Sequence, residues 1–300
     1  MTLRYIASAG AIFISSAISC NATLSTYARS RLRRVIALIT SILGSCAVFG
    51  IGALAPTASL ARPPHPRIEV GTRCQQEYQN GWQQDVGNSD VWRRCGNFNS
   101  QIGQTDNVDF YYNLHGAKTV LEKTGDNCGT GCGAADAVDL LYMNTHSGVN
   151  ATAAFWTMWD QGQYAVTSNM RLGDNGRQLM ILATFSCSTL LTSDGNVWTR
   201  WFPPFAGGLV MTLGAHNLLY AGNDQSATEF ASRMQDGEPI GLAWLESTWY
   251  ADNQNAPSAM FVGANADDCG RRGGTTLPSL YSTPILRDSA IGYMCWSTWN

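Results

Sequence analysis

Five apolar stretches separated by helical or polar segments dominate the chain after residue 105. They lie at 108–112, 138–144, 179–186, 208–213 and 258–263. The stretch 179–186 is apolar nearly throughout, which is typical of a strand buried on both faces of a sheet. Helices are expected between or after these strands, at 116–124, 151–161, 226–236 and 239–250. The alternation predicts an α/β domain over 106–300, with a mostly parallel sheet flanked by helices.

Two local signals refine this pattern. Ser226 begins the helix expected at 226–236, and Glu229 follows it at the spacing of a capping box. Residues 71–105 are polar, with Gln, Asn and Gly around Trp82 and Trp92. We therefore expect residues 62–105 to form an irregular N-terminal lobe.

The first 61 residues have the pattern of a targeting segment. They contain five Arg and no Asp or Glu, and a basic cluster at 29–34 precedes an apolar run at 35–54. Small residues at Ser59 and Ala61 fit signal-peptidase cleavage after Ala61. The prediction is a secreted, periplasmic or cell-envelope protein with no stable membrane span after processing. A retained anchor at 35–54 is the alternative, because about 20 apolar residues can cross a bilayer.

Charge and motif content restrict the partners. After Ala61 the chain has 14 Lys plus Arg and 22 Asp plus Glu, a net charge of −8. An acidic surface argues against nucleic-acid binding. The Gly-rich stretch 270–274 lacks the Lys-Ser/Thr ending of a phosphate-binding loop, and Cys128 with Cys132 has no second pair for zinc. No cofactor or metal is expected.

Seven cysteines follow Ala61, and an exported protein tends to pair them. The odd count leaves at least one free. Cys187 is the candidate, because it ends the apolar run 179–186 whereas the others lie among polar or turn residues. Proximity favours three disulfides among the 15 possible pairings: Cys74–Cys95, Cys128–Cys132 and Cys269–Cys295.

Candidate chemistry lies where strands end, since ligands of open parallel sheets bind at the carboxyl ends of the strands. His146 follows the stretch 138–144, and Cys187 ends the stretch 179–186. If these strands are parallel neighbours, both side chains emerge at one edge, where imidazole can activate the thiol. Gly148 permits close approach of a substrate carbonyl, and its amide with that of Cys187 could form an oxyanion hole.

Other interpretations stay open. Cys187 could be a buried small apolar residue, and His146 an ordinary loop histidine. His115, which also follows a predicted strand, is an alternative base, and His216 follows the stretch 208–213. Trp side chains could line a cleft, but core packing explains them as well. Asp160, Asp174 or Asp194 could supply a pocket for a basic residue.

The order of these residues resembles the caspase–gingipain–legumain class of cysteine peptidases. The resemblance covers about 138–215: a strand leading to His146, a crossover, and a strand ending in Ser186-Cys187, with 41 positions between His and Cys. It implies that His146 is the general base and acid, Cys187 the nucleophile, and Gly148 an oxyanion residue.

The motifs also depart from that class. His-Ser-Gly replaces His-Gly, and Phe-Ser-Cys-Ser replaces the caspase sequence, so caspase specificity is not implied. The Gly-Leu…Gly-Ala-His and Ala-Trp-Leu patterns are also similar to bacterial exported domains. The expected function is an exported cysteine endopeptidase, or related acyl-transfer enzyme, acting on peptides or proteins. The alternatives are an inactive binding or envelope protein of the same fold, and a carboxylate-dependent hydrolase.

Overall fold

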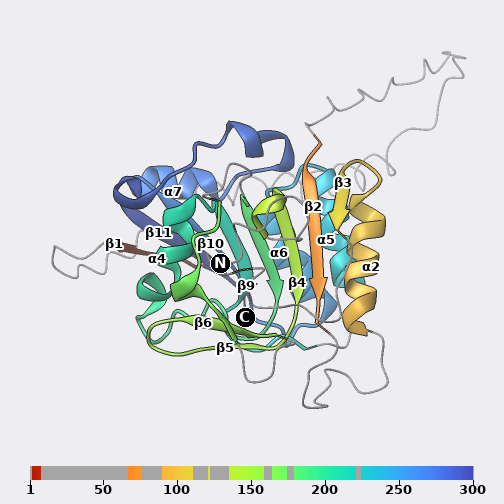
Figure 1. Cartoon of the computed structure of the whole chain (residues 1–300), viewed down its shortest axis with the longest axis horizontal. Helices are drawn as coiled ribbons and strands as arrows, with labels where there is room; N and C mark the ends of the chain where they lie inside the picture. The colour runs from red at the N-terminus through yellow and green to blue at the C-terminus, as the bar shows by residue number, and fades with distance from the viewer. Residues whose placement is uncertain are drawn as a thin grey trace, which may run out of the picture. The chain divides into compact units, whose positions relative to one another are not determined.

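The centre of the fold is one eight-stranded sheet with helices on its two faces (Figure 1). The computed structural model describes residues 2–7, 67–75, 90–110, 121, 135–158, 164–173, 179–220 and 224–299. The strand order is β1-β11-β10-β9-β8-β4-β2-β3. The prediction of an α/β fold with a mostly parallel sheet is confirmed.

The sheet has a parallel part and an antiparallel part. Five strands run parallel: β3 (Asn107–Phe110), β2 (Glu69–Cys74), β4 (Leu140–Asn144), β8 (Ile181–Phe185) and β9 (Met211–Ala215). Three more pair antiparallel beyond β9: β10 (Pro257–Gly263), β11 (Tyr293–Thr298) and β1 (Thr2–Ala7). Strands β4, β8 and β9 each have five residues, and all of these are buried, as expected for strands covered on both faces.

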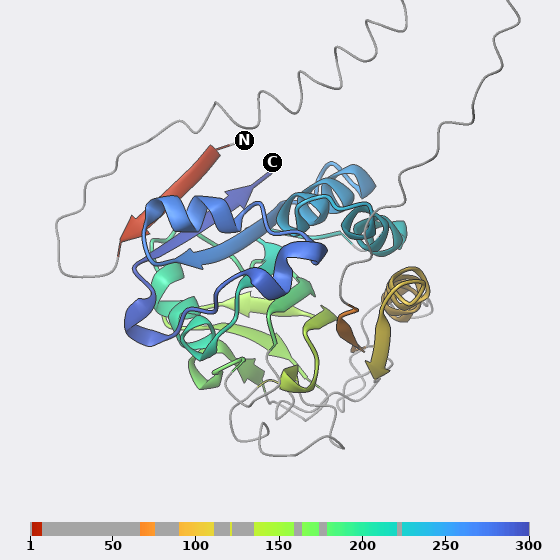
Figure 2. The same ribbon diagram turned by 90° about the horizontal axis from the view of Figure 1, so that it is seen from above.

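Two cores form on the two faces of the sheet (Figure 2). One is covered by α2 (Asp90–Ile102), α5 (Gln225–Gln235) and α6 (Ile240–Ala251), and Phe98, Phe230 and Trp244 fill it. The other lies under α4 (Val197–Gly207) and a small antiparallel sheet of β5 (Ser147–Val149), β6 (Ala154–Thr157) and β7 (Tyr164–Val166). The remaining short helices are η3 (Ala135–Ala137), η4 (Thr167–Asn169), α7 (Ala266–Arg272), η5 (Leu277–Ser282) and η6 (Asp288–Ala290).

The structure corrects the irregular lobe predicted for 62–105. Residues Glu69–Cys74 form β2, inside the sheet between β3 and β4, and Asp90–Ile102 form α2. The polar sequence did not indicate these elements, because some of their polar side chains are buried and hydrogen-bonded to each other. Thr72 is fully buried, and its Oγ1 accepts a hydrogen bond from Asn99 Nδ2 on α2 at 2.8 Å.

Three smaller predictions also differ from the structure. Ala154–Thr157, inside the expected helix 151–161, is strand β6, and its alternating buried and half-buried residues have the period of a strand. Strand β9 begins three residues later than the stretch 208–213. Asp224 is the N-cap of α5 without a side-chain hydrogen bond, and Glu229 binds Arg233 instead of closing a capping box. Of the helix expected at 116–124, only Leu121 is among the described residues, so this prediction is not tested.

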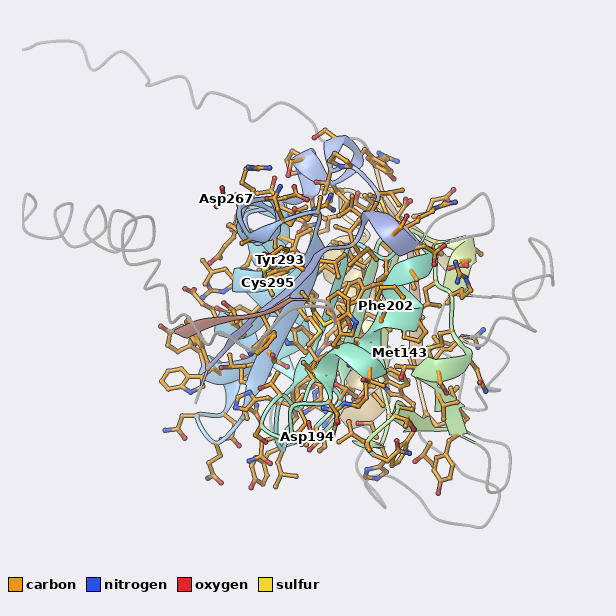
Figure 3. All side chains as sticks on the ribbon, turned by 90° about the vertical axis from the view of Figure 1, so that its left-hand side faces the viewer. Met143, Asp194, Phe202, Asp267, Tyr293 and Cys295 are labelled. Atoms are coloured by element: carbon orange, nitrogen blue, oxygen red, sulfur yellow. A yellow bond between two sulfur atoms is a disulfide. The ribbon has the colours of Figure 1, made fainter. Side chains whose placement is uncertain are left out.

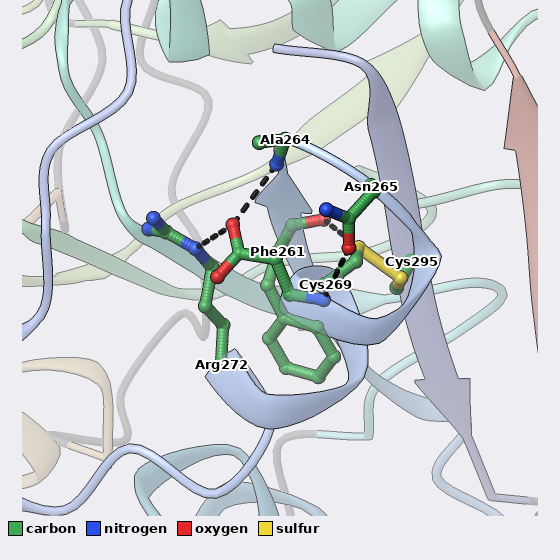
Figure 4. Close-up of a disulfide and its surroundings, with 7 residues drawn as sticks. Phe261, Ala264, Asn265, Cys269, Arg272 and Cys295 are labelled. Atoms are coloured by element: carbon green, nitrogen blue, oxygen red, sulfur yellow. Dashed lines mark hydrogen bonds and ion pairs between the residues drawn. A yellow bond between two sulfur atoms is a disulfide. The ribbon is translucent and has the colours of Figure 1, made fainter. Parts of the chain in front are cut away.

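Two disulfides join elements of the main sheet to its helices. Cys74 of β2 bonds Cys95 of α2, and Cys269 of α7 bonds Cys295 of β11. Beside the second, Asn265 Oδ1 caps α7 by accepting from the Asp268 amide at 2.9 Å (Figure 4). Both bonds confirm the predicted pairs. The predicted Cys128–Cys132 bond lies outside the described residues.

Replacing both Cys74 and Cys95 with alanine is expected to lower the free energy of unfolding by about 3 kcal/mol. The bond closes a loop of 21 residues, and its loss frees the unfolded chain. Denaturant unfolding of the double variant measures the change. The single variant Cys187→Ala is the control, since it removes a cysteine sulfur but no cross-link. Equal stability of the two variants would contradict the prediction.

No helix among the described residues is long and apolar enough to cross a membrane. The apolar run 35–54 and the predicted cleavage site after Ala61 lie outside those residues. Of the predicted targeting segment, only Thr2–Ala7 is described, and it pairs antiparallel with β11.

Candidate active site

His146 and Cys187 leave two neighbouring parallel strands at the same edge of the sheet. Strands β4 and β8 pair with Asn144 opposite Phe185, the last residue of each. His146 and Cys187 each lie two positions beyond that pair. Because side chains alternate along a strand, both are in phase with Tyr142 and Ala183, which face the core under α2, α5 and α6. The register of β4 and β8 thus brings both chain positions to the same edge of the sheet.

The main chain of His146 is held by the small sheet. Its carbonyl oxygen accepts a hydrogen bond from the Thr157 amide at 2.9 Å. The preceding residue, Thr145, donates its hydroxyl to the Thr157 carbonyl at 2.7 Å. These two hydrogen bonds hold the backbone at His146 where the chain passes from β4 into β5. The side chain of His146 is half-buried.

Cys187 is the one free cysteine of the described chain, and it is partly exposed. Its sulfur lies against the loop after β9: the Leu219 amide points to Sγ at 3.5 Å, and Sγ lies 3.7 Å from the Leu219 carbonyl oxygen. The sulfur thus contacts both the amide and the carbonyl oxygen of one residue in that loop. The interpretation of Cys187 as a fully buried apolar residue is not supported.

The backbone around Cys187 is fixed from two sides. Ser147 of β5 donates its hydroxyl to the Cys187 carbonyl at 2.5 Å. The next amide, that of Ser188, donates to the Asn217 carbonyl at 2.7 Å. Ser188 has φ +55°, a left-handed conformation that is uncommon for a residue other than glycine. Such residues concentrate at functional sites, where surrounding contacts maintain them.

Gly148 lies in β5 opposite Phe155 of β6. Hydrogen bonds join residues 146 to 157 and 150 to 153, so by antiparallel alternation the peptide groups of Gly148 face β6. Those of Ser147 point away from β6. A Cβ on Gly148 would lie 2.7 Å from Phe155 Cζ, which gives this glycine a packing role. An oxyanion role for the Gly148 amide stays a prediction, and the Ser147 amide is not committed to β6.

The other two histidines differ in placement. His216 directly follows β9, one position beyond its end, so it is in the phase opposite to Cys187. Its amide donates to the Ala256 carbonyl at 3.0 Å, and its Nδ1 is buried. His115, the alternative base, lies outside the described residues. His146 and His216 both follow strands that neighbour β8, and strand alternation favours His146 as the residue on the side of Cys187.

A buried arginine of α4 connects the two loops of the candidate site. Arg200 is fully buried, and its guanidinium binds both carboxylate oxygens of Asp194, at 2.5 and 2.8 Å. It also donates to the Leu191 carbonyl, in the loop after Cys187, and to the Asn150 carbonyl, at the β5–β6 turn, at 3.1 Å. The Arg200 bond holds the pKa of Asp194 well below its usual range, at about 2. Neither Ser147 nor Arg200 was singled out from the sequence, because their roles depend on contacts across 40 or more positions.

Acidic pockets and metal sites have little support in the described part of the chain. Asp194, one candidate for a pocket binding basic residues, has both oxygens engaged by Arg200. Asp160 and Asp174 lie outside the described ranges. Within those ranges no group of three or more His, Cys, Asp or Glu could hold a metal ion.

Comparison with known proteins gives a family without an assigned activity. No curated protein matches the chain. A family model described as "Domain of unknown function (DUF6345)" matches residues 75–273, a segment that includes β4, β8, β9 and both candidate residues His146 and Cys187. Because this match covers more than half of the 300 residues, the chain belongs to the DUF6345 family.

Proposed function

We propose that this protein is an exported cysteine hydrolase that cleaves peptide bonds, with Cys187 as nucleophile and His146 as base. One observation carries the proposal. The two residues occupy equivalent positions beyond paired parallel strands, and the hydroxyl of Ser147 bonds the segment of one to the backbone of the other at 2.5 Å. A thiol needs a nearby base to become a nucleophile, and imidazole is the commonest.

The topology supports the resemblance to the caspase–gingipain–legumain class. A parallel strand leads to the histidine, a crossover containing β5 to β7 follows, and the neighbouring parallel strand leads to the cysteine. The site lies at the carboxyl edge of the sheet, where parallel α/β proteins bind ligands. The caspase-like fold is part of the proposal.

The reaction follows from these two groups. His146 takes the proton of the Cys187 thiol, and the thiolate attacks the peptide carbonyl to form a tetrahedral oxyanion. His146 then gives the proton to the leaving amine as the C–N bond breaks, which leaves a thioester on Cys187. Water, deprotonated by His146, attacks the thioester and releases the acid and the thiol. The amide of Cys187, with that of Ser147 or Gly148, is proposed to bind the oxyanion.

Export is part of the same proposal. Two disulfides tie α2 and α7 to the main sheet, and such bonds persist in oxidising compartments. The basic, acid-free segment that precedes residue 62 has the pattern of a cleaved signal. These two features support the proposal of a secreted or cell-envelope location.

Alkylation by iodoacetamide tests the proposed dyad directly. At near-neutral pH we expect Cys187 to react at least about 10-fold faster than a free thiol, and His146→Ala to remove this advantage. Mass spectrometry locates the label, and Cys187→Ala is the blank. A wild-type rate no faster than that of a free thiol would contradict the peptidase proposal and favour an inactive binding protein.

A further inference from the structure

We propose that Ser147 is a positioning residue that fixes Cys187 relative to His146 through its side-chain hydroxyl. The inference rests on the proposed function and extends it to a residue whose side chain has no role in that reaction. Ser147 directly follows His146 in sequence, and its Oγ reaches the Cys187 carbonyl across 40 positions. The hydroxyl is thus a direct connection between the segments that carry base and nucleophile.

The contact is suited to orienting a peptide plane. At 2.5 Å the distance from Oγ to oxygen is at the short end for a hydroxyl donor, and the bond is partly buried. The same peptide unit ends in the Ser188 amide, which donates to Asn217 on the other side at 2.7 Å. Both ends of the Cys187–Ser188 peptide are therefore bound, one to the first residue of β5 and one to the loop after β9.

The left-handed conformation of Ser188 depends on these two hydrogen bonds. A non-glycine residue at φ +55° has an unfavourable backbone conformation, which persists only when its surroundings enforce it. Without the Ser147 hydroxyl, one of the two anchors is lost, and Ser188 can relax towards an ordinary φ. Such a rotation turns the Cys187 carbonyl and moves Cα, and with it the sulfur that the Leu219 amide contacts at 3.5 Å.

Ser186 provides a matched control. It lies directly before Cys187 and has the same side chain, but its buried Oγ has no hydrogen-bond partner among the described residues. Replacing Ser186 with alanine removes a hydroxyl directly next to Cys187 without breaking a hydrogen bond, so it reports the nonspecific effect of losing a nearby hydroxyl.

The test compares Ser147→Thr with Ser147→Val in the full exported chain, because these side chains have nearly the same shape and differ in one hydroxyl. We expect Ser147→Val to lower the iodoacetamide rate at Cys187 and kcat for peptide hydrolysis by about 10- to 100-fold, with KM changed less than about 2-fold. Ser147→Thr should stay within about 3-fold of wild type. Ser186→Ala should leave both rates unchanged.

The outcomes separate this inference from the proposed function. Equal rates in the Thr and Val variants, while His146→Ala still slows alkylation, would overturn the role of Ser147 and leave the dyad intact. Alkylation of the wild type at the rate of a free thiol would remove both. Loss of rate in the Val variant together with a proportionate loss of Tm in a thermal scan would show a structural role only, and would also overturn the inference.

Discussion

Cys187→Ala is expected to lower kcat/KM for peptide hydrolysis by at least about 1,000-fold, and His146→Ala by about 100- to 10,000-fold. Without the sulfur no thioester can form, and without the imidazole the thiol has no base. Rates with a fluorogenic peptide-amide library, measured for the wild type and both variants after export, give these ratios. Cys187 is partly exposed and His146 half-buried, so the thermal midpoint should change little.

The same experiment distinguishes the two described histidines. If His146→Ala keeps full activity and His216→Ala loses it, the base is the residue after β9 and the phase argument for His146 is wrong. If Cys187→Ala keeps full activity, a nucleophile other than this thiol performs the reaction. If all three variants lose activity and their thermal midpoints also fall well below that of the wild type, the loss is due to unfolding. Thermal scans of the purified proteins measure these midpoints.

Asp194→Ala is expected to lower the free energy of unfolding by about 2–3 kcal/mol. The substitution leaves the fully buried guanidinium of Arg200 without its carboxylate, and breaking a buried ion pair costs about 3–5 kcal/mol. The expected value is lower because one third of the Asp194 side chain is exposed, at 33%. A reduction in Tm of about 4–10 °C in a thermal scan would match this loss.

Asp267→Ala is the matched control for this change. Asp267 is an exposed carboxylate of α7, placed well away from Asp194 in the molecule (Figure 3), and no ion pair is described for it. It should change stability by less than about 0.5 kcal/mol. If both alanine variants unfold at the same denaturant concentration, the ion pair between Asp194 and Arg200 contributes nothing to stability.

Acid titration gives an independent check on the Asp194–Arg200 pair. The folded pKa of Asp194, about 2, lies below the unfolded value of 3.8, so its contribution is complete above about pH 4 and is lost as the pH falls towards 2. Asp194→Asn should lack this component of the pH dependence. Stability curves of the two proteins that stay parallel from pH 5 to pH 2 would contradict it.

The sheet was predictable where single strands are apolar along their whole length. The stretches 138–144 and 179–186 correspond to β4 and β8, because burial on both faces favours apolar residues at most positions of a strand. The strand β2 was missed because Thr72 and Arg73 are polar yet buried, and the partner that binds Thr72 lies on α2. The prediction of a helix at 151–161 was wrong because Ala154–Thr157 pairs with two neighbouring strands, and this pairing decides the structure of the segment.

The candidate site was predictable only in its two principal residues. The position of His146 and Cys187 at strand ends can be seen in the sequence, and the odd cysteine count indicated that Cys187 is free. The contacts of Ser147, Leu219 and Arg200 join segments that are 32 to 50 positions apart. A single sequence contains no signal for such contacts, because each depends on the register of β4, β8 and β9.

The close packing of Phe155 on Gly148 limits what mutagenesis can reveal about the oxyanion hole. Any side chain at 148 meets the aromatic ring at 2.7 Å, so a loss of activity there would report displaced β6 rather than a lost donor. The informative change is in the main chain itself. Semisynthesis that replaces the amide nitrogen of residue 147 or 148 with an ester oxygen deletes one N–H while leaving every side chain in place.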